Sequence, residues 1–297
     1  MSMRTFVIVA PGIAEVRDVD RPVPIKGQVI VDVERAGVCG TDAEIFAGHM
    51  SYLATGHAGY PIRIGHEWSG SVTAVGDDVD TAWVGRRVTG DTMLGCRHCE
   101  RCRGGRQHLC ADRHEIGIRG GWPGALAEQL PVPVTALHPL PDTVDATLGA
   151  LVEPGGNALR AVRAANLARD ERLLVLGPGT IGLLCAQIAR AGGIDVQLLG
   201  LTPPSLEFAR SLGFEQTWTA DALPPLRWDA VIDASNGAPM PALAATLVEP
   251  GRRVVYIGLS SEPSHVDSRA LVLNDVTAVG ILSASGGLAG AIELYAS

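Results

Sequence analysis

Residues 173–182, Leu-Leu-Val-Leu-Gly-Pro-Gly-Thr-Ile-Gly, decide the fold of the second half of the chain. The four leading apolar residues predict a buried strand, and the apolar run Leu183–Ala191 predicts a helix directly after the glycines. In this context the first glycine allows a tight turn, the second lets the backbone approach a pyrophosphate, and the third lets helix and strand pack closely. The stretch therefore predicts a dinucleotide site built from Gly177, Pro178, Gly179, Thr180, Ile181 and Gly182.

The remainder of this half repeats an apolar segment followed by a helical stretch. Such alternation builds an α/β domain in which helices cross over a doubly wound parallel sheet. We expect the strands of this sheet at residues 173–176, 196–199, 230–233 and 254–257.

The first half of the chain has a different pattern. Short β-type runs at 29–31, 71–75 and 87–89 are broken by Gly, Pro and Asp, which predicts a β-rich domain with many loops. A chain of 297 residues is also long enough for two domains. We expect the first domain to comprise residues 1–152 and the second, a Rossmann domain, to comprise residues 153–297.

Composition excludes several classes of protein. The formal net charge is −8, whereas nucleic-acid affinity needs clustered basic side chains that release counterions, so no nucleic-acid partner is expected. The only lysine is Lys26, and no tyrosine stands four residues before it. Mechanisms that use a catalytic lysine, including the Tyr-x-x-x-Lys pair of short-chain reductases, are therefore excluded.

No segment predicts a membrane or secretory protein. The most apolar stretch, Leu173–Ala189, contains three glycines and a proline and falls short of the roughly 20 apolar residues that span a bilayer. The N-terminal residues 1–10 lack the basic start and cleavage site of a secretion signal. We expect a cytoplasmic protein without a membrane partner.

Four of the six cysteines are clustered between residues 96 and 110. In a chain without a secretion signal, this clustering favours metal binding over disulfides. Four thiolates on a short loop are typical of closed, tetrahedral structural zinc sites. The predicted ligands are Cys96, Cys99, Cys102 and Cys110, whereas Cys185, within the helix after the glycine turn, is expected to be a buried apolar residue.

A second, more dispersed set of metal ligands is also present. Cys39 lies in Gly-Val-Cys-Gly-Thr-Asp at 37–42, and His66 and Glu67 lie in Gly-His-Glu at 65–67. A thiolate, an imidazole and a carboxylate would leave one coordination position open, as catalytic zinc sites do.

These motifs, in this order, resemble those of the zinc-containing medium-chain alcohol dehydrogenases, and most closely the branch of polyol, sugar and threonine dehydrogenases. The resemblance extends from the N-terminus through Ser297. It implies a GroES-like catalytic domain joined to a Rossmann domain, two zinc ions in each chain, and NAD or NADP as cofactor. It further implies hydride transfer between this cofactor and an alcohol or ketone.

The resemblance also assigns roles by motif position. Cys39, His66 and Glu153 would be ligands of the catalytic zinc, and Glu67 either a ligand or an exchangeable near neighbour. Glu153 stands where the simple alcohol dehydrogenases carry a cysteine, which indicates a substrate with several hydroxyl groups. The remaining matches are Thr41, which would start the proton relay, Asp42, which would orient the histidine, and Asn157, which would lie against the nicotinamide.

The cofactor preference depends on the end of the second strand, where an acidic residue would hold the ribose 2′-hydroxyl of NAD. That position is Gly200, and Thr202 follows it closely. The missing acid removes repulsion against a 2′-phosphate, which Thr202 could bind, although no Arg or Lys is near in the sequence. The sequence therefore favours NADP slightly over NAD.

Two features depart from the family pattern. Glu44 replaces a relay histidine, either as a carboxylate substitute or as a solvated side chain. Relatives also continue beyond the position of Ser297 with a segment that completes the catalytic domain, and we expect this segment to be absent. The main hypothesis is a zinc-dependent dehydrogenase of sugars, polyols or aminocyclitols that forms homodimers or homotetramers. The alternative is a catalytically impaired relative with a binding or assembly role.

Overall fold

The computed structural model describes residues 1–260 and 262–297 and divides them into two compact units. Unit 1 contains Met1–Gly156 together with Ser283–Ser297, and unit 2 contains Asn157–Leu282. Helix α5 (Val152–Ala165) begins in unit 1 and continues in unit 2. Each unit has its own buried apolar clusters.

Unit 1 is built mainly of antiparallel strands, as the broken β-type runs predict. Its five-stranded sheet has the order β10 (Leu137–Pro139), β6 (Arg87–Gly90), β5 (Trp68–Val75), β3 (Gln28–Ala36), β9 (Gln129–Pro133). Its three-stranded sheet has the order β2 (Ile13–Asp20), β1 (Ser2–Ala10), β4 (Ile62–Arg63), and a further pair joins β7 (Met93–Leu94) to β8 (His114–Glu115). Trp68 is fully buried in the core of the five-stranded sheet.

The helices of unit 1 are short. They are α1 (Gly40–Ala47), α2 (Ser51–Ala54), α3 (Glu100–Arg103), α4 (Ala146–Ala150) and α10 (Leu288–Ala296), with the single 3-10 turns η1 (Thr81–Trp83), η2 (Gln107–Leu109) and η3 (Val134–Ala136). Most connect strands through loops rich in glycine, as expected for this half of the sequence.

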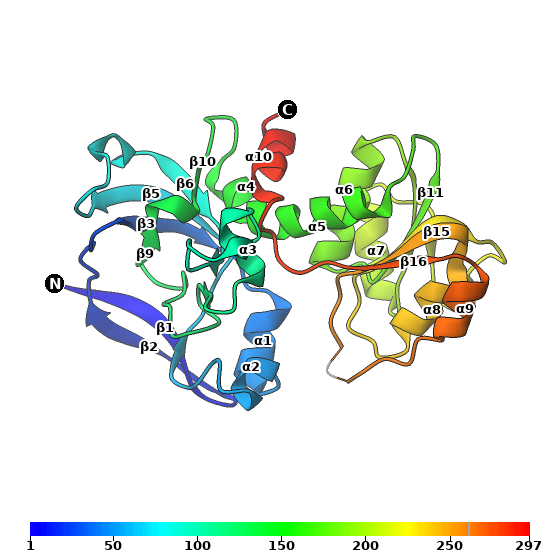
Figure 1. Cartoon of the computed structure of the whole chain (residues 1–297), viewed down its shortest axis with the longest axis horizontal. Helices are drawn as coiled ribbons and strands as arrows, with labels where there is room; N and C mark the ends of the chain where they lie inside the picture. Colours follow the sequence, from blue (N-terminus) through cyan, green and yellow to red (C-terminus); the bar gives the residue numbers. More distant parts are fainter. Residues whose placement is uncertain (261) are drawn as a thin grey trace. The chain divides into compact units, whose positions relative to one another are not determined.

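Unit 2 contains a six-stranded parallel sheet, which confirms the predicted α/β fold. The strand order is β13 (Thr217–Trp218), β12 (Asp195–Leu199), β11 (Arg172–Leu176), β14 (Trp228–Asp233), β15 (Val248–Tyr256), β16 (Thr277–Gly280). The helices are the second part of α5, α6 (Thr180–Ala191), α7 (Pro203–Ser211), α8 (Met240–Leu247) and α9 (Ser268–Leu273), and α8 and α9 lie side by side (Figure 1).

Alternating side chains of the central strand explain why this sheet is covered on both faces. On β11, Leu173 and Val175 belong to one apolar cluster, and Leu174 and Leu176 belong to another. All four are fully buried, which is why the strand is a continuous apolar run in the sequence. Cys185 is also fully buried in the first cluster, as expected for an apolar role.

The sequence missed two strands of this sheet. β13 has only two residues, and β16 lies at the sheet edge with three of its four residues exposed, so neither forms a buried apolar run. The predicted segment 254–257 ends as a strand at Tyr256, since Ile257 already turns toward the carbonyl oxygen of Asp233.

The C-terminal residues belong to a different unit from the expected one, since we expected all of residues 153–297 to form the Rossmann domain. Here Ser283–Ser297 packs in unit 1, where α10 (red) lies beside α4 (Figure 1). The reason is apolar burial: Ala284, Leu288 and Ala291 are buried in one cluster with Leu140 and Val144.

Candidate functional site

Cys39 and His66 meet in unit 1, although 27 residues separate them. The Sγ atom of Cys39 lies 3.0 Å from Nε2 of His66. Cys39 caps the N-terminus of α1, where its sulfur accepts a hydrogen bond from the Thr41 amide at 3.3 Å. His66 follows β4 through Gly65, whose φ of +102° and close contact with the Leu126 amide leave no room for a β-carbon. The turn thus directs the buried imidazole toward the cysteine.

Asp42 lies behind this histidine. Its carboxylate is 3.5 Å from Nδ1 of His66 and accepts a hydrogen bond of 3.0 Å from the Cys39 amide. Burial by itself lowers the pKa of His66, but the contacts with Asp42 and Cys39 outweigh it and raise this pKa well above its ordinary value. The carboxylate therefore favours a proton on Nδ1 and leaves Nε2 facing the cysteine.

These three side chains fit a metal ion. Single ligand atoms of Cys39, Asp42 and His66 all lie within 4.8 Å of one another. A thiolate and an imidazole suit zinc, and a carboxylate on the far nitrogen of a ligating histidine is the usual arrangement around it. The donor set is therefore compatible with zinc bound by Cys39 and His66.

Glu67 and Glu153 lie outside this group of three within the described chain. Both are buried, at 7% exposure each. Glu67 packs against Gly37, where a β-carbon would lie 2.2 Å from its Oε2, and burial raises the pKa of this carboxyl group. Glu153 lies in the first turn of α5. Neither carboxylate belongs to the group of described ligand atoms that all lie within 4.8 Å of one another.

Thr41 and Glu44 both belong to α1 and are half-buried. Residues three apart on a helix face the same side. The two side chains are therefore neighbours on one face of a helix whose N-terminus is capped by Cys39.

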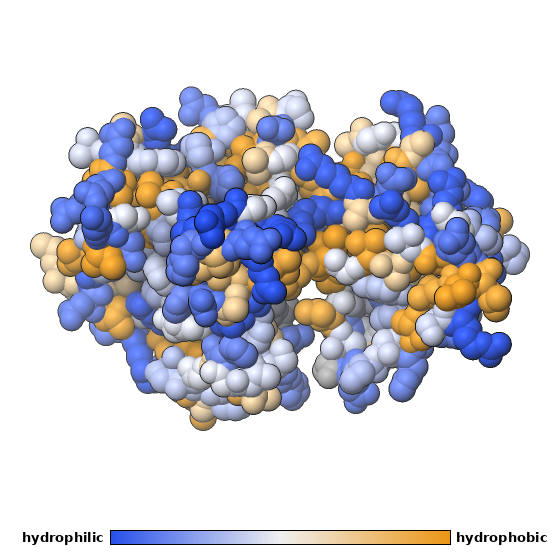
Figure 2. Space-filling model, in the orientation of Figure 1, coloured by the Kyte–Doolittle hydropathy of each residue, from blue (hydrophilic) through white to orange (hydrophobic). Residues whose placement is uncertain are grey.

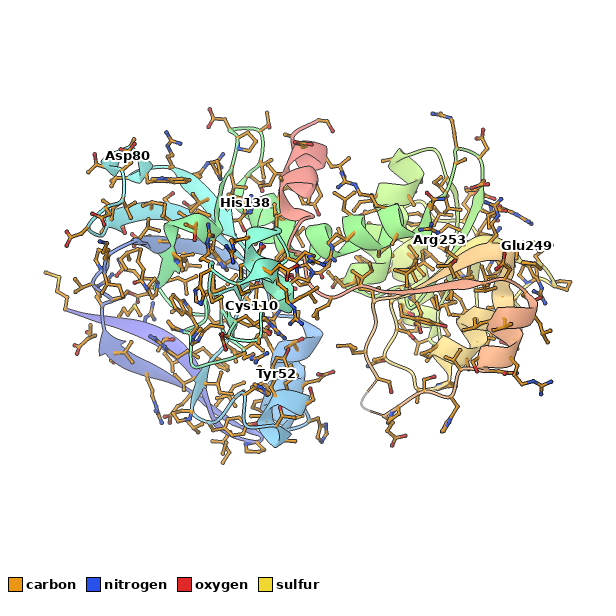
Figure 3. The ribbon with its side chains drawn as sticks, in the orientation of Figure 1. Tyr52, Asp80, Cys110, His138, Glu249 and Arg253 are labelled. Carbon is orange, nitrogen blue, oxygen red and sulfur yellow. The ribbon has the colours of Figure 1, made fainter. Side chains whose placement is uncertain are left out.

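The four cysteines of the second motif also come together. Cys96 and Cys102 sulfurs are 4.0 Å apart, and Cys99 and Cys110 sulfurs are 3.9 Å apart, with Cys110 fully buried (Figure 3). In a tetrahedral site with zinc–sulfur bonds of about 2.3 Å, neighbouring sulfurs are roughly 3.8 Å apart. The set therefore has the dimensions of a structural zinc site.

Two cysteines of this loop, Cys96 and Cys102, differ in how readily they lose their protons. Backbone hydrogen bonds from Cys99 and His98 lower the pKa of Cys96 to about 6, whereas burial raises the pKa of Cys102 to about 12. Figure 2 shows strongly hydrophilic side chains over α3 and its loop. The exposed arginines there are Arg97, Arg101, Arg103 and Arg106.

The glycine turn of unit 2 has the geometry of a phosphate site. Gly177 has a φ of +89°, and a β-carbon on Gly182 would lie 2.0 Å from the Gly177 carbonyl oxygen. A β-carbon on Gly179 would meet nothing within 4 Å. Thr180 and Ile181 open helix α6, and Pro178 is buried beneath the turn. Gly179 thus leaves open space at the helix N-terminus, where amides bind anions.

A second loop, which the sequence motifs did not predict, completes this end of the sheet. Asp233 ends β14 beside β11, and its buried carboxylate accepts hydrogen bonds from the amide and the hydroxyl of Ser235, at 3.0 and 2.6 Å. Ser235 in turn contacts Gly177. A polar residue directly after a buried parallel strand is a recognisable signal, because ligands bind at the carboxyl ends of such strands.

Three other predicted cofactor residues lie in unit 2. Gly200 is buried at the end of β12, where a β-carbon would lie within 2.9 Å of Leu206 and Pro178. Thr202 is exposed and caps α7, with its hydroxyl 3.0 Å from that of Ser205. Asn157 is half-buried on α5. Gly200 therefore has no room for the acidic side chain of NAD-binding sites.

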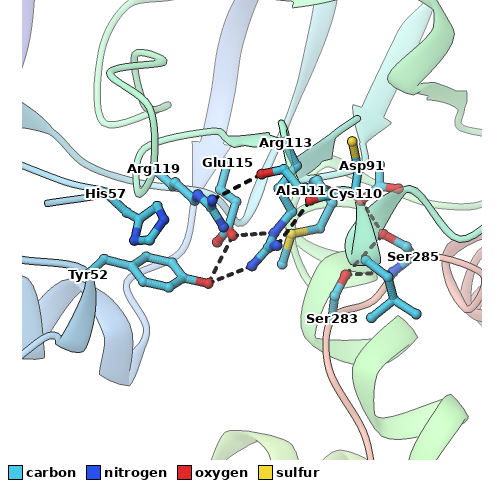
Figure 4. Close-up of polar contacts among 12 residues, drawn as sticks. Tyr52, His57, Asp91, Cys110, Ala111, Arg113, Glu115, Arg119, Ser283 and Ser285 are labelled. Carbon is cyan, nitrogen blue, oxygen red and sulfur yellow. Dashed lines mark hydrogen bonds and ion pairs between the residues drawn. The ribbon is translucent and has the colours of Figure 1, made fainter. Parts of the chain in front are cut away.

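A buried polar network in unit 1 was also missed (Figure 4). The Tyr52 hydroxyl donates to Glu115 at 3.1 Å, and Arg113 donates to both Glu115 and the Tyr52 oxygen at 2.8 Å. The network joins α2 to the segment after Cys110. No spacing pattern predicts it, because Tyr52 lies more than 60 positions before Arg113 and Glu115.

No helix in the described residues is long and apolar enough to cross a membrane.

Comparison with known proteins places these sites in a family. The alcohol dehydrogenase GroES-like domain matches residues 25–142, and the zinc-binding dehydrogenase domain matches residues 180–297. An L-threonine 3-dehydrogenase of Saccharopolyspora erythraea is 34% identical over 284 residues, covering 92% of this chain and 81% of that protein.

Solved structures agree with this relationship. An Escherichia coli protein described as a short chain alcohol dehydrogenase, complexed with NADH, has a TM-score of 0.90 at 27% identity, covering 99% of this chain and 87% of that one. Galactitol-1-phosphate dehydrogenase of Escherichia coli has a TM-score of 0.88 at 26% identity, covering 99% and 88%. The chain belongs to the zinc-binding alcohol dehydrogenase family, which confirms the resemblance and its assignment to the oxidoreductases.

Proposed function

We propose that this protein oxidises a secondary alcohol of the sugar, polyol or aminocyclitol type with NAD(P), and reduces the corresponding ketone. The observation that carries the proposal is the 3.0 Å approach of Cys39 Sγ to His66 Nε2, with the Asp42 carboxylate on the opposite ring nitrogen. The same chain also has a glycine turn suited to a pyrophosphate.

In the proposed mechanism Cys39 and His66 would hold the catalytic zinc, and Glu153 would be the third ligand, with Glu67 as an exchangeable neighbour. When bound, zinc polarises the alcohol oxygen as a Lewis acid and the nicotinamide accepts the hydride. Asp42 keeps the proton on Nδ1 of His66 and so fixes the ring. The amides at the start of α6 would bind the pyrophosphate, and Asn157 would contact the nicotinamide.

We propose that side chains of α1 carry the proton of the substrate alcohol away from the site. The Thr41 hydroxyl accepts the alcohol proton and passes it outward. Glu44, one helical turn away on the same face of α1, is the acceptor that replaces the usual histidine.

Two observations support a substrate with several polar groups. Glu153 occupies the position where the simple alcohol dehydrogenases carry a cysteine. The relatives reported above are named for threonine and galactitol 1-phosphate, both of which carry a further polar group beside the alcohol.

We further propose NADP as the preferred cofactor, because Gly200 cannot accommodate an acidic side chain that would repel a 2′-phosphate. The exposed Thr202 hydroxyl, which donates to the Ser205 hydroxyl in this structure, lies two residues further along the chain and would turn to a 2′-phosphate. We also propose a cytoplasmic homodimer or homotetramer, which sedimentation analysis of the purified protein will test.

The proposal is tested by metal analysis combined with turnover. We expect two zinc ions per chain and reduction of NADP or NAD with at least one member of a panel of polyols, sugars, aminocyclitols and threonine. Cys39→Ser and His66→Gln are each expected to remove one zinc and to lower kcat at least a hundredfold, while Cys185→Ser retains both. Two bound zinc ions, bound dinucleotide and no turnover across the panel would instead favour a binding or assembly role.

A further inference from the structure

A hollow in unit 1, of about 380 Å³, lies beside β4 and is distinct from the Cys39–His66 cluster. Its walls come from residues 56–59, 61–63, 118 and 120–123. No aspartate or glutamate lines it, although the whole chain is acidic, with a net charge of −8. Its charged lining residue is Arg63, which is accompanied by His57.

Arg63 is half-buried at the end of β4. Across residues 1–260 and 262–297, no hydrogen bond or ion pair reaches its guanidinium group. Burial without a partner lowers the pKa of Arg63. A half-buried charge is stabilised by a partner of opposite sign, so this geometry favours an anion that the folded chain does not itself supply.

The neighbouring arginines differ in this respect. Arg113 is bound by Glu115 and by the Tyr52 hydroxyl. Arg119 donates to the Ala111 carbonyl oxygen at 3.3 Å and lies over the Tyr52 ring. Both are seen in Figure 4, where Arg113 reaches the Tyr52 hydroxyl and Glu115. Arg63 is therefore the arginine of this region that is left to bind a ligand.

The walls of the hollow suit a small oxyanion. Gly56, Gly59 and Gly121 line the same hollow, and each has open space where a β-carbon would stand, so side chains at these positions do not fill it. His57 keeps its Nδ1 atom 2.8 Å from the Thr55 hydroxyl, which leaves the other ring nitrogen for a second contact. A planar guanidinium binds carboxylate and phosphate groups by paired hydrogen bonds.

The hollow is also within reach of the metal cluster. Arg63 is three residues before His66, and three residues of extended chain span at most about 10 Å. We propose that Arg63 and the hollow beside β4 bind a phosphate or carboxylate group carried by the alcohol substrate. This assignment rests on the proposed function and narrows its substrate class to anionic polyols, sugars or hydroxy acids.

The binding test uses the zinc-loaded, full-length protein titrated calorimetrically with inorganic phosphate and with acetate. We expect Arg63→Gln to weaken phosphate binding about tenfold or more, and Arg63→Lys to retain part of it because the charge remains. Arg163→Gln, which removes an equal charge from an exposed position on α5, is the matched control and is expected to bind as the unaltered protein does. Equal phosphate affinity in Arg63→Gln would overturn the proposal.

The kinetic test distinguishes a group carried by the substrate from a free anion. With a phosphorylated polyol and its neutral parent, Arg63→Gln is expected to raise KM about tenfold for the phosphorylated compound only. Equal changes for both compounds, together with lost phosphate binding, would make the hollow a free-anion site and would also overturn the proposal. The titration needs no turnover, so failure of the dehydrogenase function would be recognised separately.

Discussion

The Ser285 hydroxyl donates a hydrogen bond of 2.8 Å to the Asp91 carboxylate, 194 positions earlier in the chain. Both side chains are buried. The same carboxylate accepts hydrogen bonds from the Gln107 side chain at 2.8 Å and from the Met93 amide at 2.9 Å. Asp91 is therefore hydrogen-bonded both to the C-terminal segment and to the four-cysteine loop. Figure 4 shows Ser283, Ser285 and Asp91 close together.

Removing this hydroxyl should loosen unit 1. Ser285→Ala leaves a buried carboxylate with one donor fewer, so we expect the free energy of unfolding to fall by about 1–3 kcal/mol. Urea denaturation followed by tryptophan fluorescence measures the change. Ser297→Ala is the control, because its exposed hydroxyl bonds only to the nearby Leu294 carbonyl oxygen. Equal denaturation midpoints for both variants would show that the contact with Asp91 has no stabilising role.

Zinc binding by the four-cysteine loop should depend on pH in a specific way. Cys102, with a pKa of about 12, must release its proton at every accessible pH. Cys96, with a pKa of about 6, is already a thiolate above pH 6 and is protonated below it. Below about pH 6 zinc must therefore displace one additional proton, and the apparent affinity should fall a further tenfold per pH unit.

Competition with a chromophoric chelator, calibrated at each pH, measures this dependence. A Cys39→Ser background leaves the four-cysteine loop as the measured site. A single unbroken slope between pH 5 and pH 8 would contradict the role given to Cys96.

Local sequence patterns predicted much of the fold. The apolar runs of β11, β12 and β14 are visible because both faces of a central parallel strand are buried. The short or exposed edge strands β13 and β16 have no such run. The return of Ser283–Ser297 to unit 1 was not predicted either, since it depends on tertiary contacts such as Ser285 with Asp91.

The same distinction holds for the candidate sites. The four cysteines and the glycine turn are contiguous motifs, so their spacing alone indicated what they form. Only the folded chain shows that Tyr52 and Glu115, which are far apart in the sequence, share a network. Likewise, Arg63 is of a residue type common at protein surfaces, and only the folded chain shows that it lines a hollow. The placement of Glu153 as a zinc ligand stays a prediction.

The role of Asp42 as a positioning residue can be separated from its role in the helix. Asp42→Asn keeps an oxygen that can accept the Cys39 amide hydrogen bond of the α1 cap, but it removes the negative charge beside His66. We expect zinc affinity at the Cys39–His66 site to fall by about 10- to 100-fold, with zinc retained in the four-cysteine loop. Metal analysis after dialysis against a weak chelator should give one zinc per chain, against two for the exposed control Asp142→Asn. Two zinc ions in both variants would exclude this role.

Two glycines of the turn after β11 should respond differently to the same substitution. A β-carbon at Gly182 would lie 2.0 Å from the Gly177 carbonyl oxygen, so Gly182→Ala must displace the helix and should lower both stability and dinucleotide binding. At Gly179 the space is open and φ is −87°, so Gly179→Ala should change stability by no more than about 1 kcal/mol. Its methyl group would nevertheless occupy the region where a pyrophosphate approaches the amides of α6, and NAD(P) affinity should fall at least tenfold. Thermal unfolding and fluorescence titration with NADPH and NADH separate the two effects. Unchanged dinucleotide affinity in Gly179→Ala would mean that the cofactor phosphates bind elsewhere, because a phosphate bound at the α6 amides would collide with the added methyl group.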